Sequence, residues 1–362
     1  MIEDFKNKIK HFDLFSGFGG FTIACESVGI ETIGFSEIDK WANAVLRYRF
    51  PNIKNYGDIT KIIPSKLPDF DLLTFGSPCQ DLSIAKKNRE GLSGSRSSLF
   101  YNAVDILKIK KPKWFIMENV ASMGKENKEI ITKILKEIYP DTECYSINAS
   151  LVSAQNRRRL FWTNIPNITQ PTDKGILLKD ILESGIPSEY NRLTGIKIGK
   201  GKSQTISASD WRGLNRNQTQ TCVRIGQIGK GGQGDRIYSP EGKSVGLSAL
   251  GGGRGAKTGL YLIQGGAKRT RSGKKQTELN KQEKANAITS VQTDSMVAIK
   301  DIIRKLTPIE CERLMTLKND WTKYGIDEKG NQIEISNSQR YRLCGNGIVI
   351  EVVKGIVEKL FI

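Results

Sequence analysis

Short apolar runs alternate with amphipathic helical patterns over residues 10–163, and this alternation constrains the fold more than any other feature. Six runs are predicted to be strands: His11–Phe15, Thr32–Ser36, Asp71–Phe75, Trp114–Glu118, Glu143–Ala149 and Leu160–Asn164. Helices are predicted near Gly20–Val28, Lys40–Arg49, Ser98–Lys108 and Asn127–Ile138. Strands that alternate with helices form a mostly parallel sheet covered on both faces. We therefore expect an α/β, Rossmann-like large domain.

Polar residues follow four of these predicted strands, where ligands of parallel sheets bind. They are Ser16-Gly17, Glu37, the segment Gly76–Gln80, and Glu118-Asn119. Because the carboxyl ends of parallel strands meet at one edge of a sheet, we expect these residues to share a site.

Residues 13–21 are predicted to form a strand end, a glycine turn and a helix start. The dinucleotide fingerprint G-x-G-x-x-G is not matched, because position 22 is Thr. A carboxylate such as Glu37, about 20 residues further on, can accept hydrogen bonds from both ribose hydroxyls. Asp58, in the sequence Gly57-Asp58-Ile59, could hold an adenine amino group. These features favour a nucleoside cofactor without a diphosphate over NAD.

Two strand ends carry candidate catalytic side chains. Cys79 follows Pro78, whose fixed φ presents the thiol on a rigid turn, as a nucleophile requires; the alternative is a buried core thiol. Glu118 ends an apolar strand, where burial would raise its pKa and make it a proton donor; the alternative is a helix cap or a salt bridge. If residues 155–159 are a strand, Gln155, Arg157 and Arg159 share one face and could bind an anion or a carbonyl oxygen.

The net charge of +18 is concentrated in one segment. Residues 192–284 hold 19 Lys and Arg against 5 Asp and Glu, and 19 of the 36 Gly. Strands are predicted in the wider module between about 186 and 303, at Cys222–Ile225, Leu260–Ile263 and Met296–Ile299. A basic module inside a nearly neutral chain favours a polyanionic partner; the alternative is a solvated linker.

The remaining composition excludes several classes of protein. His11 is the single histidine and the six cysteines include no C-x-x-C pair, so we expect no metal site. Apolar runs are too short for a membrane helix and residues 1–6 do not resemble a signal peptide, so we expect a cytoplasmic protein that contacts no membrane. Hydrophobic residues make up 38% of the chain, which excludes global disorder.

Five motifs together resemble the DNA (cytosine-5)-methyltransferases of bacteria and phages. They are Asp13–Phe21, Gly76–Gln80, Glu118–Val120, Gln155–Arg159 and Gln339–Gly347, in that order. Residues 229–239 and 247–259 resemble the target-recognition domain of GCGC-type enzymes. Three positions depart from the pattern: Ser77 replaces a frequent Phe, Gly347 a frequent Ser, and Leu250 an aromatic residue. Residues 265–303 exceed what one such recognition module needs.

The resemblance implies a reaction that uses S-adenosylmethionine and no metal. Cys79 would add to C6 of a flipped-out cytosine, Glu118 would protonate N3, and Arg157 and Arg159 would hold O2. The cofactor would contact twelve residues: Phe15, Gly17, Phe18, Gly19, Gly20, Glu37, Ile38, Asp58, Ile59, Pro78, Leu99 and Asn346. The polar segment Gln80–Arg96 would be a mobile lid.

Duplex DNA is the partner that the resemblance implies, with a GCGC or GCNGC site as target. The implied DNA contacts are Ser83, Arg96, Lys230, Gln233, Arg236, Gly252 and Gly253. Gln233, flanked by glycines, would replace the flipped base opposite its guanine, and Arg236 would read a guanine; the alternatives are a solvated turn residue and a phosphate contact. We expect a monomer, and a cognate restriction endonuclease is a further candidate partner.

The predicted division of the chain is a catalytic and cofactor domain over residues 1–185, to which residues 338–362 return, and a recognition domain over 186–337. Residues 266–284 are linker-like. Two other functions stay open: a tRNA cytosine-5 methyltransferase, which would carry a shorter recognition region, and a nicotinamide oxidoreductase with a basic appendage.

Overall fold

The computed structural model describes residues 8–77, 99–184 and 306–362, and between the last two ranges the backbone of strands β9 to β16. The large sheet has the order β3-β2-β1-β4-β5-β8-β6, and β8 runs antiparallel to both of its neighbours. Its strands are β1 (Lys10–Leu14), β2 (Glu31–Ser36), β3 (Lys54–Asn55), β4 (Leu72–Phe75), β5 (Trp114–Val120), β6 (Glu143–Asn148) and β8 (Arg158–Thr163). The predicted α/β fold with a mostly parallel sheet is confirmed.

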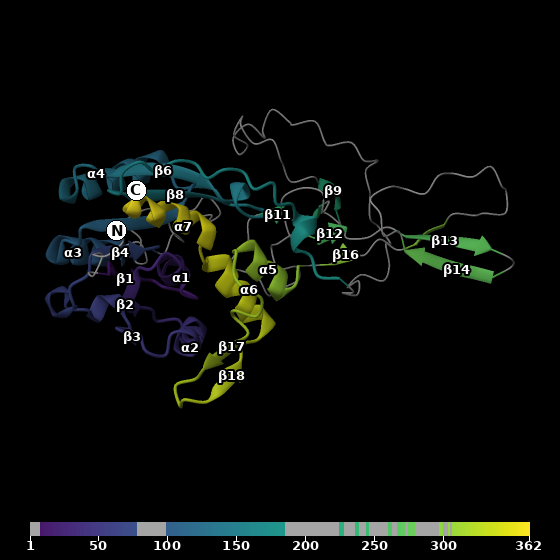
Figure 1. Cartoon of the computed structure of the whole chain (residues 1–362), viewed down its shortest axis with the longest axis horizontal. Coiled ribbons are helices and arrows are strands. Elements are labelled where there is room, and N and C mark those ends of the chain that lie inside the picture. Colours follow the sequence, from purple (N-terminus) through teal and green to yellow (C-terminus); the bar gives the residue numbers. More distant parts are fainter. Residues whose placement is uncertain are drawn as a thin grey trace, which may run out of the picture.

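Helices cover both faces of this sheet (Figure 1). They include α1 (Gly20–Glu26), α2 (Lys40–Arg49), α3 (Leu99–Lys110), α4 (Lys125–Ile138) and the short 3-10 turns η1 (Ile59–Lys61), η2 (Pro64–Lys66), η4 (Ala149–Leu151) and η5 (Leu178–Ile181). All four helices that the sequence predicts near these positions are present, with ends displaced by at most two residues.

Alternation along each strand divides the core in two, because successive side chains point to opposite faces. On β5, Phe115 and Met117 pack with the helices α3 and α4, whereas Ile116 between them packs with α1 and α7 (Ile350–Val357). The central strands β1 and β4 are therefore buried on both sides, as in a parallel sheet between helix layers.

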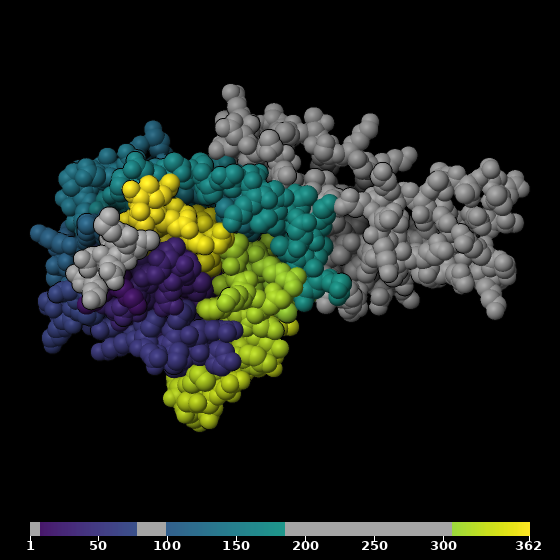
Figure 2. All heavy atoms as spheres, viewed as in Figure 1, coloured from purple at the N-terminus to yellow at the C-terminus, as the bar shows by residue number. Residues whose placement is uncertain are grey.

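The C-terminal segment returns to the large sheet. The helix α7 and the turn η8 (Glu358–Phe361) follow α6 (Asn337–Asn346), and the buried face of α7 packs on α1. Gly20 allows this close approach, because a Cβ there would lie 2.4 Å from Ile348. In Figure 2 this yellow segment lies between the purple N-terminal residues and the teal residues that precede residue 185.

Residues 306–335 are anchored on the outside of α2. They contain α5 (Pro308–Leu314) and the hairpin β17 (Tyr324–Ile326) and β18 (Gln332–Glu334). Arg47 Nε donates to the carbonyl of Ile326 at 2.8 Å, and Arg49 donates to two carbonyls of the segment while its guanidinium lies 4.6 Å from the ring centre of Trp321.

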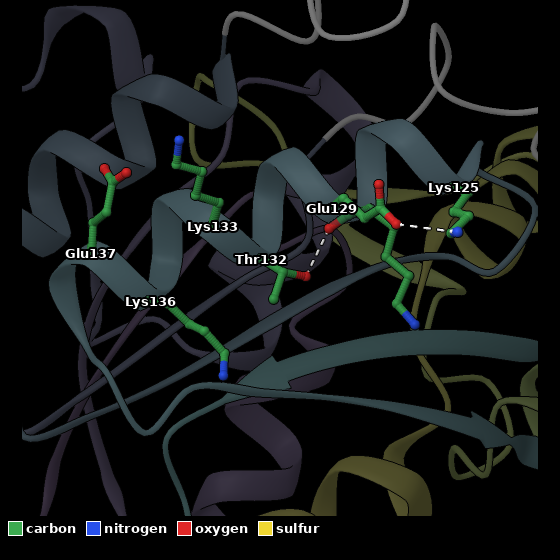
Figure 3. A pocket seen from close by; sticks show the side chains of 7 residues that line it. Lys125, Glu129, Thr132, Lys133, Lys136 and Glu137 are labelled. Carbon is green, nitrogen blue, oxygen red and sulfur yellow. Dashed lines mark hydrogen bonds and ion pairs between the residues drawn. The ribbon is translucent and has the colours of Figure 1, made fainter.

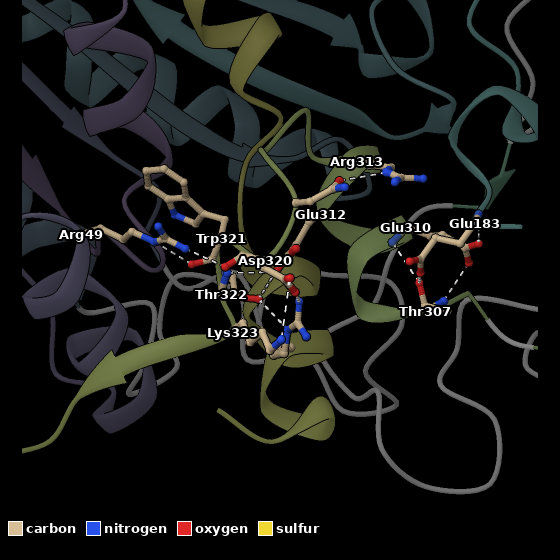
Figure 4. Close-up of polar contacts among 12 residues, drawn as sticks. Arg49, Glu183, Thr307, Glu310, Glu312, Arg313, Asp320, Trp321, Thr322 and Lys323 are labelled. Atoms are coloured by element: carbon tan, nitrogen blue, oxygen red, sulfur yellow. Dashed lines mark hydrogen bonds and ion pairs between the residues drawn. The ribbon is translucent and has the colours of Figure 1, made fainter. Parts of the chain in front are cut away.

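A buried ion pair holds α6 to this segment (Figure 4). Arg340 Nη2 lies 2.9 Å from Glu312 Oε1 and 3.1 Å from Asp320 Oδ1, and the side chain of Glu312 is fully buried. Thr322 also bonds Glu312 through its backbone N at 2.9 Å. Residues on α5, on α6 and in the loop before β17 are thus locked together.

The strands between residues 224 and 304 form two further sheets, which lie to the right of the large sheet in Figure 1. One has the order β16-β12-β10-β9 and consists of β9 (Arg224–Gln227), β10 (Arg236–Tyr238), β12 (Leu260–Leu262) and β16 (Ile303–Arg304). The other, β14-β13-β15, consists of β13 (Gly266–Arg271), β14 (Lys274–Leu279) and β15 (Val297–Ile299). In addition, β11 (Ser244–Val245) pairs with β7 (Gln155–Asn156), which precedes β8.

Within the described part of the chain, no helix has the length and apolar content to cross a membrane.

Candidate active site

The loop between β1 and α1 has an unusual backbone. Phe15, Gly17 and Gly19 have φ angles of +57°, +56° and +88°, a region that favours glycine and costs energy at Phe15. Two contacts from outside the loop hold it in place. The N–H of Gly17 donates to Glu37 Oε2 at 2.7 Å, and Trp321 Nε1 donates to the carbonyl of Phe18 at 3.2 Å.

Glu37, at the end of β2, is the polar centre of this region. Its Oε1 accepts from the backbone N–H groups of Ile38 and Asp39 at 2.8 and 2.7 Å. Burial raises the pKa of Glu37, and these donors, together with Gly17, partly oppose the shift. Oε2 accepts only from Gly17 among the described residues, so one of its lone pairs can still accept from a bound ligand.

Beside the loop lies space that no described residue fills, as a ligand site requires. A Cβ built at Gly17 or at Gly57 would meet no atom of the described residues within 4 Å. The side chain of Ile38 is 67% exposed, whereas Ile59 is buried in the core. Asp58 is partly exposed, and its Oδ1 accepts from the backbone and hydroxyl of Thr60, which lowers its pKa. The residues present fit a nucleoside with vicinal hydroxyls.

Phe18 and Gly347 explain one departure from the family pattern. The ring of Phe18 is buried, and a Cβ at Gly347 would lie 1.9 Å from it. The φ of Gly347 is −79°, so backbone conformation does not require glycine there. This chain therefore carries Gly at position 347 because the Phe18 ring fills the space. Asn346, the last residue of α6, is exposed beside it.

Glu118 lies at the end of β5 and pairs with Arg159 of β8. Arg159 Nε is 2.9 Å from Glu118 Oε1, with the two side chains 21% and 18% exposed. Burial raises the pKa of Glu118, and the charges of Arg159 and Arg157 lower it less than burial raises it. The raised pKa that the sequence predicts for this carboxyl group is confirmed. Gly76 leaves room for it, since a Cβ there would be 3.2 Å from Glu118 Oε2.

Residues 155–159 differ from the continuous strand that the sequence predicts. The strand is interrupted at Arg157, between β7 and β8, yet Arg157 and Arg159 line the same small pocket. Gln155 donates to the carbonyl of Leu314 at 3.2 Å, and Arg157 Nη2 donates to the carbonyls of Gly345 and Gly347 at 3.0 and 2.7 Å. Arg159 alone of the three pairs with the carboxylate of Glu118.

Sequence reasoning missed a contact next to the predicted nucleophile. Asn119 Nδ2 donates to Ser77 Oγ at 3.3 Å, and both side chains are buried. Ser77 is the last described residue before Pro78 and Cys79. This bond therefore ties the end of β4 to the strand that carries Glu118. The Ser at position 77, where the family frequently has Phe, is the sequence signal from which the contact could have been inferred.

Several predicted site residues lie outside the described residues: Pro78, Cys79, Ser83, Arg96, Lys230, Gln233, Gly252 and Gly253. Arg236 begins β10, for which the backbone alone is described, and Leu99 is the partly buried first residue of α3. Among the described residues, no group of three or more His, Cys, Asp or Glu could hold a metal ion.

An open hollow of about 630 Å³ lies along α4, away from these residues (Figure 3). Its described lining consists of Lys125, Lys128, Glu129, Thr132, Lys133, Lys136 and Glu137. Lys125 and Glu129 are 3.6 Å apart and largely exposed. The hollow shares no residue with the predicted sites, and its mixed charges select no ligand.

One family model and several known proteins match nearly the whole chain in sequence. The family model described as C-5 cytosine-specific DNA methylase matches residues 9–361. The chain is 32% identical to the type II methyltransferase M.HhaI of Haemophilus parahaemolyticus over 96% of this chain and 93% of that protein. It is 27% identical to the orphan methyltransferase M.SPRI of Bacillus phage SPR, over 98% and 97% of the two chains.

Solved structures share the fold at low sequence identity. The structure of the Entamoeba histolytica methyltransferase EhMeth superposes with a TM-score of 0.60 at 15% identity, covering 98% of both chains. That of the S. pombe Dnmt2 methyltransferase gives 0.56 at 16% identity, again over 98% of both chains.

Proposed function

Because the chain belongs to the C-5 cytosine-specific DNA methylase family, whose members use S-adenosylmethionine and act on double-stranded DNA, we propose that it methylates C5 of a flipped-out cytosine in a short GC-containing site. GCGC and GCNGC are the candidate sites. The observation that carries the proposal is the Glu118–Arg159 pair at 2.9 Å, at the strand end beside Gly76 and Ser77.

Glu118 is the group that protonates the base. Cytosine C5 is a weak nucleophile, and it becomes an enamine carbon when the Cys79 thiolate adds to C6 and N3 gains a proton. A carboxyl group with a raised pKa can supply that proton at neutral pH. After C5 has taken the methyl group, loss of the C5 proton, breakage of the C6–S bond and return of the N3 proton to Glu118 release the product and the thiolate.

Arg159 and Arg157 have different tasks in this proposal. Arg159 contacts Glu118 directly and restrains the carboxyl group while the charge of the base changes. Arg157 adds positive potential while its guanidinium fixes the carbonyls of Gly345 and Gly347 beside the cofactor loop. Holding cytosine O2 is a further proposed role of both guanidinium groups.

The cofactor site is formed by the loop Phe15–Gly20, Glu37, Ile38, Asp58 and Asn346. S-adenosylmethionine supplies an electrophilic methyl group when it is bound. Glu37 accepts hydrogen bonds from the ribose hydroxyls, Ile38 offers an exposed apolar surface to the adenine, and Asp58 accepts from the adenine amino group. The open space at Gly17 allows the loop backbone to approach the ligand closely.

Target recognition is assigned to residues 186–337, and catalysis and cofactor binding to residues 1–185 with 338–362. Residues 306–335 of the recognition segment are anchored on α2 and α6, as described above. Gln233 and Arg236 are the proposed base-reading residues. Since the excess positive charge lies in residues 192–284, DNA affinity should fall steeply with salt concentration.

The test is methyl transfer to defined nucleic acids. We expect incorporation into duplex DNA with GC-containing sites and none into tRNA, and the Cys79→Ala variant should bind S-adenosylhomocysteine but transfer no methyl group. A duplex with 5-fluorocytosine at the target should trap the protein covalently, because fluorine cannot leave as the proton does. Transfer to tRNA alone, or full activity of Cys79→Ala, would overturn the proposal.

A further inference from the structure

A buried chain of polar side chains crosses three strands of the large sheet beneath the cofactor loop. The His11 ring lies between two threonine hydroxyls, with Nδ1 2.8 Å from Thr32 Oγ1 on β2 and Nε2 2.7 Å from Thr74 Oγ1 on β4. Thr74 Oγ1 is 3.0 Å from Asp13 Oδ1, and Thr22 Oγ1 on α1 is 3.2 Å from Asp13 Oδ2. All five side chains are buried.

Counting hydrogens determines how these four contacts are made. With Asp13 ionised and His11 neutral, four hydrogens are available: one from each of the three threonine hydroxyls and one from the ring. Each contact needs one hydrogen. Thr22 and Thr74 must both donate to the carboxylate, so the ring must donate to Thr74 through Nε2–H and accept from Thr32 at Nδ1. This arrangement satisfies every group, as buried polar groups require.

Asp13 connects this set of hydrogen-bonded side chains to the proposed cofactor loop. It is the residue before Leu14, where β1 ends, and its backbone carbonyl accepts from Ser16 Oγ at 3.0 Å. Through Thr22 its carboxylate also holds the first turn of α1. The two ends of the loop, β1 and α1, are thereby fixed to one carboxyl group.

We propose that His11 is a positioning residue for the cofactor loop: neutral and protonated on Nε2, it directs the Thr74 hydroxyl to Asp13, which in turn holds α1 through Thr22. The proposal rests on the proposed function only in taking Phe15–Gly20 as the cofactor loop. No step of the methyl transfer uses His11.

Burial supports the proton arrangement. It lowers the pKa of His11 to about 3, so the ring stays neutral, and it raises the pKa of Asp13 to about 7. The titratable groups facing Asp13 are Glu37 at the end of β2, whose charge also raises the pKa of Asp13, and the buried Cys25 thiol on α1. Below about pH 7 Asp13 gains a proton, so the hydrogen-bonded set of side chains holds one extra hydrogen and one of its four contacts must rearrange.

The tautomer can be measured directly, because the protein has one histidine. Long-range ¹H–¹⁵N spectra of the full-length protein labelled with ¹⁵N-histidine should show a single neutral ring at pH 8 with its proton on Nε2. A proton on Nδ1 at pH 8, or a ring that titrates near its ordinary pKa of about 6.5, would overturn the proposal whether or not the protein is a methyltransferase.

Binding of S-adenosylhomocysteine, measured by calorimetry at pH 8, tests the positioning role. Thr74→Val should weaken binding roughly tenfold, as expected for the loss of a hydrogen bond to a charged group, and Thr74→Ser should restore it. His11→Gln, which keeps an N–H donor, should bind more tightly than His11→Phe. The matched control is Thr163→Val, which removes another buried hydroxyl of the same sheet, bonded to the carbonyl of Phe115.

The pH profile separates positioning from a loss of stability. Binding to the wild type should weaken as the pH falls through about 7, and binding to Asp13→Asn should lack this component. Equal effects of Thr74→Val and Thr163→Val, or identical profiles for wild type and Asp13→Asn, would refute the positioning role. If the wild type itself does not bind S-adenosylhomocysteine, the proposed function fails, and the tautomer result still decides the state of His11.

Discussion

Replacing His11 by Gln should change how the stability of the protein depends on pH. In the folded protein the His11 pKa is lowered to about 3, whereas the unfolded chain titrates at 6.5. Between these values the unfolded state binds a proton that the folded state excludes. The contribution of His11 to the free energy of unfolding therefore increases as the pH rises to 6.5, by about 1.4 kcal/mol per pH unit.

Asp13 produces the opposite slope. Its pKa is raised from 3.8 to about 7, so between these values the folded state retains a proton that the unfolded state has lost. The contribution of Asp13 to the free energy of unfolding decreases as the pH rises through this interval, again by about 1.4 kcal/mol per pH unit. From about pH 4 to 6.5 the two contributions nearly cancel in the wild type.

The two single variants should separate these contributions. Relative to wild type, His11→Gln should lose about 3 kcal/mol of unfolding free energy between pH 4.5 and 6.5, because the Asp13 slope is no longer opposed. Asp13→Asn should gain about as much over the same interval. The assay is urea unfolding followed by tryptophan fluorescence at pH 4.5, 5.5 and 6.5. If the free energy of unfolding of both variants depends on pH as that of the wild type does, the burial argument is refuted.

Three further outcomes follow from the structure. Glu118→Gln should slow methyl transfer by more than about 10²-fold, as expected for loss of a general acid, with DNA affinity in a gel-shift assay nearly unchanged; a rate within a few-fold of wild type would assign N3 protonation to another group. Gly347→Ser should weaken S-adenosylhomocysteine binding because its Cβ meets the Phe18 ring, and Phe18→Leu should rescue it; binding that Ser leaves unchanged would refute the steric explanation. Arg340→Met should destabilise the protein by about 3–5 kcal/mol in denaturant melts, since it leaves the buried Glu312 without its cation; adding Glu312→Gln should recover much of the loss, and a melt unchanged by Arg340→Met would contradict the burial of the pair.

The sequence determined the architecture of the large domain because local pattern and core burial agree there. Largely apolar strands that are buried on both faces and helices with one apolar face leave one arrangement, a parallel sheet between two helix layers. Residues 348–361 also carry apolar residues at helical spacing, and this segment forms α7 and η8. The raised pKa of Glu118 could be predicted for the same reason, since a carboxyl group that ends an apolar strand is desolvated.

Only the tertiary structure decided which polar groups meet. Alternating positions predicted that Gln155, Arg157 and Arg159 would share a face, and Arg157 and Arg159 do line one pocket. The pattern did not indicate that Arg157 bonds carbonyls nearly 190 residues away in the sequence. A histidine in an apolar strand indicates no partner by itself, and β1 had to be placed between β2 and β4 before His11 could meet two threonines. Hydrogen bonds act over about 3 Å, so their partners are fixed by packing between segments, which periodicity within one segment does not encode.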